Sequence, residues 1–281
     1  MTKHRDTFRC LAIRQPYAWA AAVGVKDIEN RSWSTDFRGT FVIQASSHKT
    51  DVSRVAKKLG KKPNDPRFVY SALLGVADLV ECVPLSPEHE ASPWAYGRYL
   101  FRIENARLFE KPIPAKGKLN LYHLDETLDA KVREQLPSAK PAVLSEEDHA
   151  WLRAMHADPI EQRQEYVYSY AHFERWDEVE RLASGFVEIE PEVAFGWGYR
   201  GIARSYRKPP ELEAGLADLN RAVELTESED PFWLHHRAMT SGDLGRVEEG
   251  KRDVARVREL DPEYFDRLGI KKSDDADDAD E

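Results

Sequence analysis

The chain has 281 residues, of which 41% are hydrophobic and 10% aromatic, and its formal net charge is −9. This length and composition favour two globular domains or one large one. No run approaches the roughly 18 apolar residues of a membrane-spanning helix, and Cys10 and Cys82 are too far apart for a CxxC metal site or a disulfide framework.

The first ten residues, MTKHRDTFRC, contain no apolar run, so we expect no signal peptide and a cytoplasmic protein. Charge is divided unevenly along the chain. Residues 1–125 carry 20 Lys and Arg against 13 Asp and Glu, whereas residues 126–281 carry 21 against 37. A basic first part suits a polyanion, which an acidic second part would repel. The sequence therefore predicts two domains with different functions.

The first part shows mainly strand signals. Pro16 is suited to begin a short helix, and Gly24 to end it. The apolar run around Gly75 is typical of a central strand, in which this glycine permits a bend. Pro112, Pro114 and Gly117 mark a loop. The expected helices cover residues 17–23 and 48–59. Residues 26–31 are expected to turn into a strand, and further strands are expected at 40–45, at 72–82 and within 94–108, where alternation runs from residue 99 to 103.

Charged side chains are concentrated between Gly24 and Gly39. In a strand, the side chains of Glu29 and Arg31 lie on the same face. Lys26, Arg31 and Arg38 could contact phosphate or a base edge, because arginine offers a planar fork of donors. Trp33 could stack on a base, and Glu29 could orient a cation or accept from a base amino group. The alternative is a structural lattice of ion pairs with Trp33 in the core.

Residues 10–125 resemble an ASCH domain, a small β-barrel of the PUA-like superfamily found in activating signal cointegrator proteins. The resemblance is carried by Leu11-x-Ile13-x-Gln15-Pro16-Tyr17-Ala18, Gly24-x-Lys26-x-x-Glu29-x-Arg31-Ser-Trp33-x-Thr35, Phe37-Arg38-Gly39, Ile43-x-Ala45-Ser46 and the run 72–82. It implies RNA or DNA binding in a cleft formed by Lys26, Glu29, Arg31, Trp33 and Arg38, with Gln15 beside them. The loop 116–121 lies near that cleft in the family, which adds Lys118 and Asn120.

One branch of this family resembles an enzyme that hydrolyses N4-acetylcytidine with a lysine, a threonine three residues later and a distant glutamate. Lys26 fits the lysine, but the position three residues later is Glu29, which is not a hydroxyl nucleophile. Some relatives are ribonucleases. A hydrolase acting on a modified nucleoside or on RNA through Lys26 and Glu29 is thus the alternative to simple binding, with Glu29 as general base.

Helical signals dominate after residue 125. Residues 125–136 and 145–156 predict two helices, separated by a proline-containing linker over residues 137–141. Three triplets, at 187–189, 223–225 and 258–260, then recur 36 and 35 residues apart, and a proline follows each. This period resembles the tetratricopeptide repeat, which has two helices per unit. Such arrays bind peptides in a concave groove.

The family's groove positions correspond to Trp197, Arg200, Arg204 and Arg207 in the second unit. Three arginines on one helical face would suit an acidic peptide. The alternative is that they pair with nearby carboxylates. The histidines are scattered, so we expect no metal site, and no cofactor is indicated.

The predicted fold class is therefore α+β: a PUA-like β-barrel at residues 1–125, a helical linker at 126–157, a tetratricopeptide-like array at 158–268 and a disordered acidic tail at 269–281. The first functional hypothesis is a nucleic-acid-binding adaptor, most simply for RNA, whose repeats recruit a protein or peptide. The second is the hydrolase. The third is a protein-interaction scaffold that binds no nucleic acid.

Overall fold

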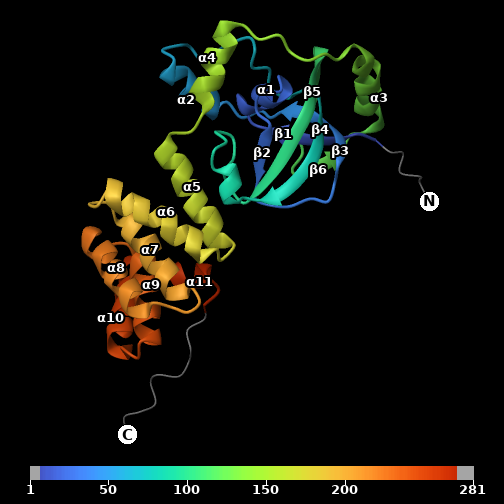
Figure 1. Cartoon of the computed structure of the whole chain (residues 1–281). Helices are drawn as coiled ribbons and strands as arrows, with labels where there is room; N and C mark the ends of the chain where they lie inside the picture. Colours follow the sequence, from blue (N-terminus) through green and yellow to red (C-terminus); the bar gives the residue numbers. More distant parts are fainter. Residues whose placement is uncertain (1–6, 271–281) are drawn as a thin grey trace, which may run out of the picture. The chain divides into compact units, whose positions relative to one another are not determined.

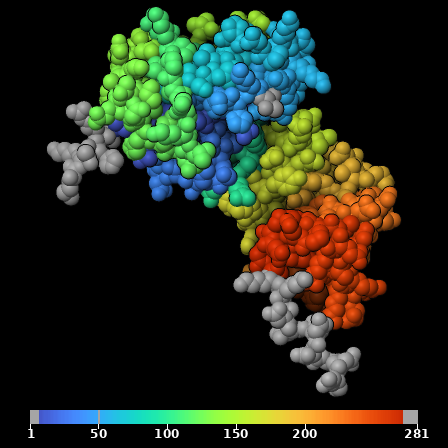
Figure 2. Space-filling view, turned by 180° about the vertical axis from the view of Figure 1, so that it is seen from behind, coloured from blue at the N-terminus to red at the C-terminus, as the bar shows by residue number. Residues whose placement is uncertain are grey.

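A computed structural model describes residues 7–270, which form two compact units (Figure 1). The first unit runs to Ser169 and the second begins at Tyr170. The helices predicted within residues 126–157 belong to the first unit. In the space-filling view the first unit runs from blue to yellow-green and the second continues to red (Figure 2). The predicted acidic tail lies outside the described residues from residue 271 onward.

The first unit is built on one mixed six-stranded sheet that curls into a half-barrel (Figure 1). The strand order is β2-β5-β4-β3-β1-β6, so β2 and β6 are its two edges. β1 and β3 pair in parallel, and the other neighbours are antiparallel. The strands are β1 (Arg9–Ile13), β2 (Ile28–Arg31), β3 (Gly39–Ala45), β4 (Ala72–Pro84), β5 (Tyr99–Pro114) and β6 (Leu121–His123).

Alternation along the strands gives the sheet an apolar core on each face. In β1, Leu11 and Ile13 join one core, whereas Cys10 between them joins the other. In β3, Phe41 and Val42 are divided in the same way. Successive side chains of a strand point to opposite faces, so both faces of this sheet need a cover. Helix α1 (Tyr17–Ala22) packs into the first core, and α3 (Glu126–Gln135) packs into the second.

The curl of the sheet has a local cause in the pairing of its two long strands. The register of β4 and β5 shifts at three places, one of them between Leu73 and Gly75. A Cβ on Gly75 would lie 2.2 Å from the carbonyl oxygen of Arg107, so only glycine fits there. The prediction of a bend at Gly75 is confirmed. The prediction of a loop from Pro112 is wrong, because β5 continues to Pro114. Pro112 pairs with no residue of β4, so the N–H that proline lacks is not needed for a hydrogen bond between these strands.

Two of the remaining helices of the first unit begin at capping side chains, whereas α2 (Thr50–Lys58) begins after Lys49, which makes no side-chain cap. Asp125 caps α3 by accepting from the backbone of Leu128, and Ser145 forms a capping box with Asp148. Besides α1, α2 and α3, the unit contains α4 (Glu146–Met155), the first part of α5 (Pro159–His172) and two short 3₁₀ turns, Pro87–His89 and Leu136–Ser138. Helix α2 packs on α4.

The second unit is made of paired helices, as the repeat pattern predicted. The triplets at 187–189, 223–225 and 258–260 are the final turns of α6, α8 and α10. Each of these helices packs against the partner helix next to it in the chain. The bounds are α6 (Trp176–Ile189), α7 (Ala194–Tyr206), α8 (Leu212–Leu225), α9 (Pro231–Asp243), α10 (Val247–Leu260) and α11 (Tyr264–Arg267). The predicted fold class, a β domain followed by paired helices, is confirmed.

Candidate functional site

A pocket of about 590 Å³ opens on the first unit where the sheet has curled but not closed. Its lining comes from the end of β1, the start of α1, the edge strand β2, helix α2, the segment before β5 and the loop 118–120. Five of the lining side chains are cationic and two are carboxylates, so positive charge is in excess. These charged residues are Arg14, Lys26, Arg31, Arg54, Lys118, Glu29 and Asp51.

The charged centre of the pocket is a triad on and beside β2. The ammonium of Lys26 donates to Oε2 of Glu29 over 2.7 Å and also donates to the carbonyl of Ile28. The other carboxylate oxygen, Oε1, lies 3.1 Å from the guanidinium of Arg31. Glu29 therefore holds two cations at once, and the expectation that Glu29 and Arg31 share a face is confirmed.

Burial dominates the electrostatics of Lys26, whose residue is only 1% exposed. Removal from water lowers the pKa of Lys26, while the charge of Glu29 and its hydrogen bond act in the opposite direction. Since both oxygens of Glu29 are engaged, the triad is a compact ion cluster with its own internal partners. Of the three residues, Arg31 is the most exposed, with 21% of its side chain accessible.

Aromatic side chains form walls of the pocket. Trp33 is partly buried and meets the ring of Phe101 edge-on, with centroids 5.1 Å apart. It packs against the core, as one of the two alternatives expected, and it also lines the pocket. Tyr96 and Tyr17 line it as well. Burial, and secondarily the charge of Glu29, raises the pKa of Tyr96, so its hydroxyl is a neutral donor.

Exposed side chains surround this centre. Arg54 of α2 donates to the hydroxyl of Tyr17 over 2.9 Å. The ammonium of Lys118 lies 5.6 Å from the ring centre of Tyr122. Arg14 is exposed and makes no ion pair within residues 7–270. Next to Lys118, Leu119 is 89% exposed, which is unusual for a leucine and places an apolar side chain at a polar pocket.

The structure brings together six of the eight residues expected at the cleft: Lys26, Glu29, Arg31, Trp33, Lys118 and Asn120. Gln15 is fully buried instead. Its amide donates to the carbonyl of Val69 and its oxygen accepts from the backbone of Trp19, so it fixes the start of α1. Arg38 lines a different pocket with Arg9 and His123, and donates to the backbone of its own turn.

Arg14, Arg54 and Tyr96 are among the polar groups of this pocket that sequence reasoning missed. Arg54 comes from a helix, and Tyr96 comes from a loop without regular structure. Neither lies in the motif around Lys26, so only their position in the folded chain identifies them. Arg14 directly follows β1. Its position next to Gln15, which was expected beside the cleft, could have identified it as a pocket residue.

In the second unit, the expected groove residues are engaged with carboxylates. The guanidinium of Arg200 makes two hydrogen bonds to Asp218, of 2.8 and 2.7 Å. Arg204 donates to Asp218 and also to Glu180. Asp218 is nearly buried, and these bonds raise the pKa of Arg200. Arg200 and Arg204 therefore pair with nearby carboxylates, which is the alternative that the sequence left open.

The other two groove residues are likewise in contact with their own chain. Arg207 donates to Glu180 and to Glu211, each over 3.0 Å. The indole of Trp197 donates to the carbonyl of Pro191, and Arg200 lies over its ring at 4.8 Å. An incoming peptide would have to compete with these internal partners.

Between residues 7 and 270, His, Cys, Asp and Glu side chains do not gather in a group of three or more that could hold a metal ion. In the same range, the helices are too short or too polar to cross a membrane. Cys10 is a buried thiol without a disulfide, and burial raises its pKa to about 12.

Comparison with known proteins gives a distant similarity for half of the chain. Activating signal cointegrator 1 of Homo sapiens is 27% identical over 148 residues, and that of Mus musculus is 26% identical over the same length. The match covers 48% of this chain and 25% of each of those proteins, so the chain corresponds to about a quarter of their length. No protein-family model matches the chain.

Two solved structures resemble part of the chain. One is the first TPR of Spaghetti (RPAP3) bound to the HSP90 peptide SRMEEVD, which is 23% identical with a TM-score of 0.34. The other is the first TPR domain of human RPAP3, also 23% identical, with a TM-score of 0.35. Each covers 38% of this chain and 82% of the other chain.

Proposed function

We propose that the protein is a nucleic-acid-binding adaptor whose first unit holds single-stranded RNA in the pocket around Lys26, Glu29 and Arg31. The carrying observation is the composition of that pocket, in which cationic side chains exceed carboxylates and three aromatic rings form walls. Phosphate requires the cations, and a base requires a flat ring or a polar edge. A volume of about 590 Å³ falls in the usual range for small-ligand sites and is suited to one nucleotide rather than a duplex.

Contacts to phosphate and contacts to the base would be made by different residues of the pocket. Arg14 and Lys118 are exposed and have no carboxylate partner within residues 7–270, so they are available to phosphate oxygens. The triad is internally neutralised except for one excess positive charge. Beside it, Tyr96 offers a hydroxyl for a base edge and Trp33 offers part of its ring, whereas the amide of Asn30 is bonded to the backbone of Trp94 and Tyr96.

Fluorescence anisotropy of the full chain with labelled single-stranded RNA, single-stranded DNA and duplex DNA tests this proposal. We expect single-stranded RNA to bind most tightly and binding to weaken with salt. Arg14→Ala and Lys118→Ala should each lower affinity several-fold and reduce the salt slope by about one charge. Lys131→Ala is the matched control, since this exposed lysine lies on α3, outside the pocket lining. Equal binding by all variants, or none to any probe, would overturn the proposal.

The second candidate is the hydrolase, and one observation favours it. Burial lowers the pKa of Lys26 beside a carboxylate in a pocket, which is how enzymes prepare an amine for chemistry. Against it, Lys26 is almost inaccessible and both oxygens of Glu29 are occupied. Turnover of N4-acetylcytidine that disappears in Glu29→Gln would support catalysis. No turnover across a panel of modified nucleosides would argue for binding alone.

For the second unit, we propose recruitment of a protein through the arginine face of α7. Arg204 and Arg207 keep 24% and 29% of their side chains exposed, so a carboxylate on a peptide can reach them by replacing Glu180. Isothermal titration of the full chain with acidic peptides checks this. Arg207→Ala should weaken the binding of an acidic peptide and leave RNA binding unchanged. If Arg207→Ala binds the acidic peptide as tightly as the parent, the arginine face of α7 is not the binding site.

A further inference from the structure

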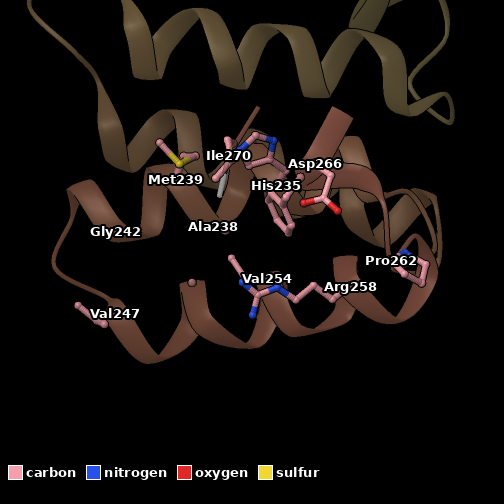
Figure 3. Close-up of a pocket in the computed structure, with 12 residues that line it drawn as sticks. His235, Ala238, Met239, Gly242, Val247, Val254, Arg258, Pro262, Asp266 and Ile270 are labelled. Atoms are coloured by element: carbon pink, nitrogen blue, oxygen red, sulfur yellow. The ribbon is translucent and has the colours of Figure 1, made fainter. Parts of the chain in front are cut away.

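A second hollow, of about 540 Å³, lies between α9 and α10 of the helical unit, away from the arginine face of α7. Figure 3 shows Ala238 and Met239 on α9 opposite Val254 on α10, with Pro262 and Asp266 toward one end. Met239, Val247 and Ile270 in its lining are about half exposed, at 47%, 53% and 46%. Large apolar side chains exposed together in this way mark an interaction surface.

The internal repeat identifies which surface this is. Arg200 of α7 pairs with Asp218 of α8, and Arg237 of α9 pairs with Asp253 of α10 in the same two-pronged manner. Matching these pairs relates α7 to α9 by 37 residues and α8 to α10 by 35. By this register, the close contact between Gly201 and Gly215 should recur between Ala238 and Gly250. It does, because a Cβ on Gly250 would lie 3.0 Å from the Ala238 carbonyl oxygen.

With this register, the hollow corresponds to the face of α7 and α8 on which α9 packs. Trp233 of α9 lies against Gly198, and Thr240 of α9 donates to the hydroxyl of Ser205 over 3.0 Å. The counterparts of Gly198, Gly201, Ile202 and Ser205 are His235, Ala238, Met239 and Gly242, and those of Leu212, Gly215, Leu219 and Val223 are Val247, Gly250, Val254 and Arg258. All eight counterparts line the hollow.

Burial shows that the face lacks its cover. Ile202 is 3% exposed beneath α9, whereas its counterpart Met239 is 47% exposed. Val223 is 1% exposed, whereas its counterpart Arg258 is exposed. The short helix α11 supplies Tyr264 and Phe265 next to His235 but does not run along the face. A helix-length apolar surface is therefore left open on the last helix pair of the described chain.

We propose that this hollow is a docking site for an amphipathic helix of a partner protein, which carries an acidic residue beside its apolar stripe. A helix is the shape that covers the equivalent face one repeat earlier. The acidic residue follows from Arg258, which replaces Val223, lies over the ring of Phe265 and makes no ion pair among the described residues. Residues 271–281 have Ala276 and Ala279 as their only apolar side chains, so their sequence does not contain the apolar stripe that the hollow would bind.

The occupant also differs from α9 in one respect. Where α7 has Gly198 beneath the indole of Trp233, α9 has His235, whose ring already contacts Tyr264 and Phe265. A tryptophan at that position of the partner helix would collide with this imidazole. The partner helix is therefore expected to carry a small residue there and its large aliphatic residues further along, opposite Met239 and Val254.

The test titrates the full chain with three labelled 16-residue helical peptides. One has a leucine stripe flanked by glutamates, the second has the same stripe flanked by lysines, and the third has serines in place of the leucines. We expect the first to bind about tenfold more tightly than the third. Met239→Lys and Val247→Lys should each abolish this gain, and Arg258→Gln should remove the preference for glutamates over lysines.

Ile189→Lys is the matched control, since Ile189 is 57% exposed at the end of α6 and outside the hollow. It should leave peptide binding intact, and all four variants should show the circular dichroism and melting temperature of the parent. Equal binding of leucine and serine peptides, or full binding by Met239→Lys, would overturn the proposal. So would sedimentation showing a dimer that Met239→Lys dissociates, because a second copy would then be the occupant.

Discussion

The guanidinium of Arg31 donates to the carbonyl oxygen of Ala12 over 2.8 Å, and this bond joins β2 to β1. In the sheet these two strands are separated by β5, β4 and β3. The contact is possible only because the sheet curls until its edge strand approaches the far side. It also places the triad of Lys26, Glu29 and Arg31 at the opening of the half-barrel, where the pocket lies.

Glu29→Gln should lower the free energy of unfolding by about 3 kcal/mol, because it leaves the buried ammonium of Lys26 without its counter-ion. Chemical denaturation followed by circular dichroism measures this change. The double variant Lys26→Met with Glu29→Gln should recover part of the loss, since the uncompensated charge is then removed. A Glu29→Gln variant as stable as the parent would show that the ion pair contributes nothing net.

The stability of the second unit should fall as the pH is lowered through the range in which His236 titrates. Burial, helped by His235, lowers the pKa of His236 from 6.5 to about 4, and its Nδ1 has no hydrogen-bond partner among the described residues. Between these two pKa values His236 is protonated in the unfolded state and neutral in the folded state. The free energy of unfolding therefore decreases as the pH falls from about 6.5 to about 4.

At pH 5 this effect should amount to about 2 kcal/mol relative to pH 7.5. Urea denaturation of the parent and of His236→Phe at both pH values isolates it, because the variant lacks the titrating group. The exposed His149→Phe serves as the control and should lose as much stability as the parent. Parallel losses in parent and His236→Phe would contradict the assignment.

Gly198→Ala and Gly185→Ala should have opposite effects although both glycines are inside helices. A Cβ on Gly198 would lie 2.2 Å from the ring of Trp233, so the variant should lose about 2 kcal/mol through overpacking. A Cβ on Gly185 meets no atom within 4 Å, so this variant should gain about 0.5–1 kcal/mol from helix propensity. Thermal unfolding of both variants measures these changes in stability. A lower stability of both variants would refute the packing argument.

Asp218→Asn should be more destabilising than Asp253→Asn, by about 1 kcal/mol. Asp218 accepts from Arg200 and Arg204, whereas Asp253 accepts from Arg237. Both carboxylates are nearly buried in equivalent helices, so each variant is the control of the other. Equal losses in denaturation midpoints would mean that the second arginine of Asp218 adds nothing to stability.

The sequence by itself determined the elements and much of the triad. Proline, glycine and capping residues placed α1, α3 and α4 within a residue or two, because these signals act over a few neighbouring positions. The two-residue period of a strand put Glu29 and Arg31 on one face. The recurring triplets marked the ends of three helices, since each closes a unit of the same length.

Only the tertiary structure decided which of these residues share a pocket. Gln15 lies in the neighbouring motif but donates to the carbonyl of Val69, 54 residues away, and Arg38 donates to the backbone of its own turn. Arg54 and Tyr96 come to the pocket from a helix and a loop that no short-range pattern connects to Lys26. The uncovered face of α9 and α10 was likewise invisible in the sequence. A repeat motif indicates how the two helices of one unit pack against each other, whereas the exposure of their outer face is visible only in the folded structure.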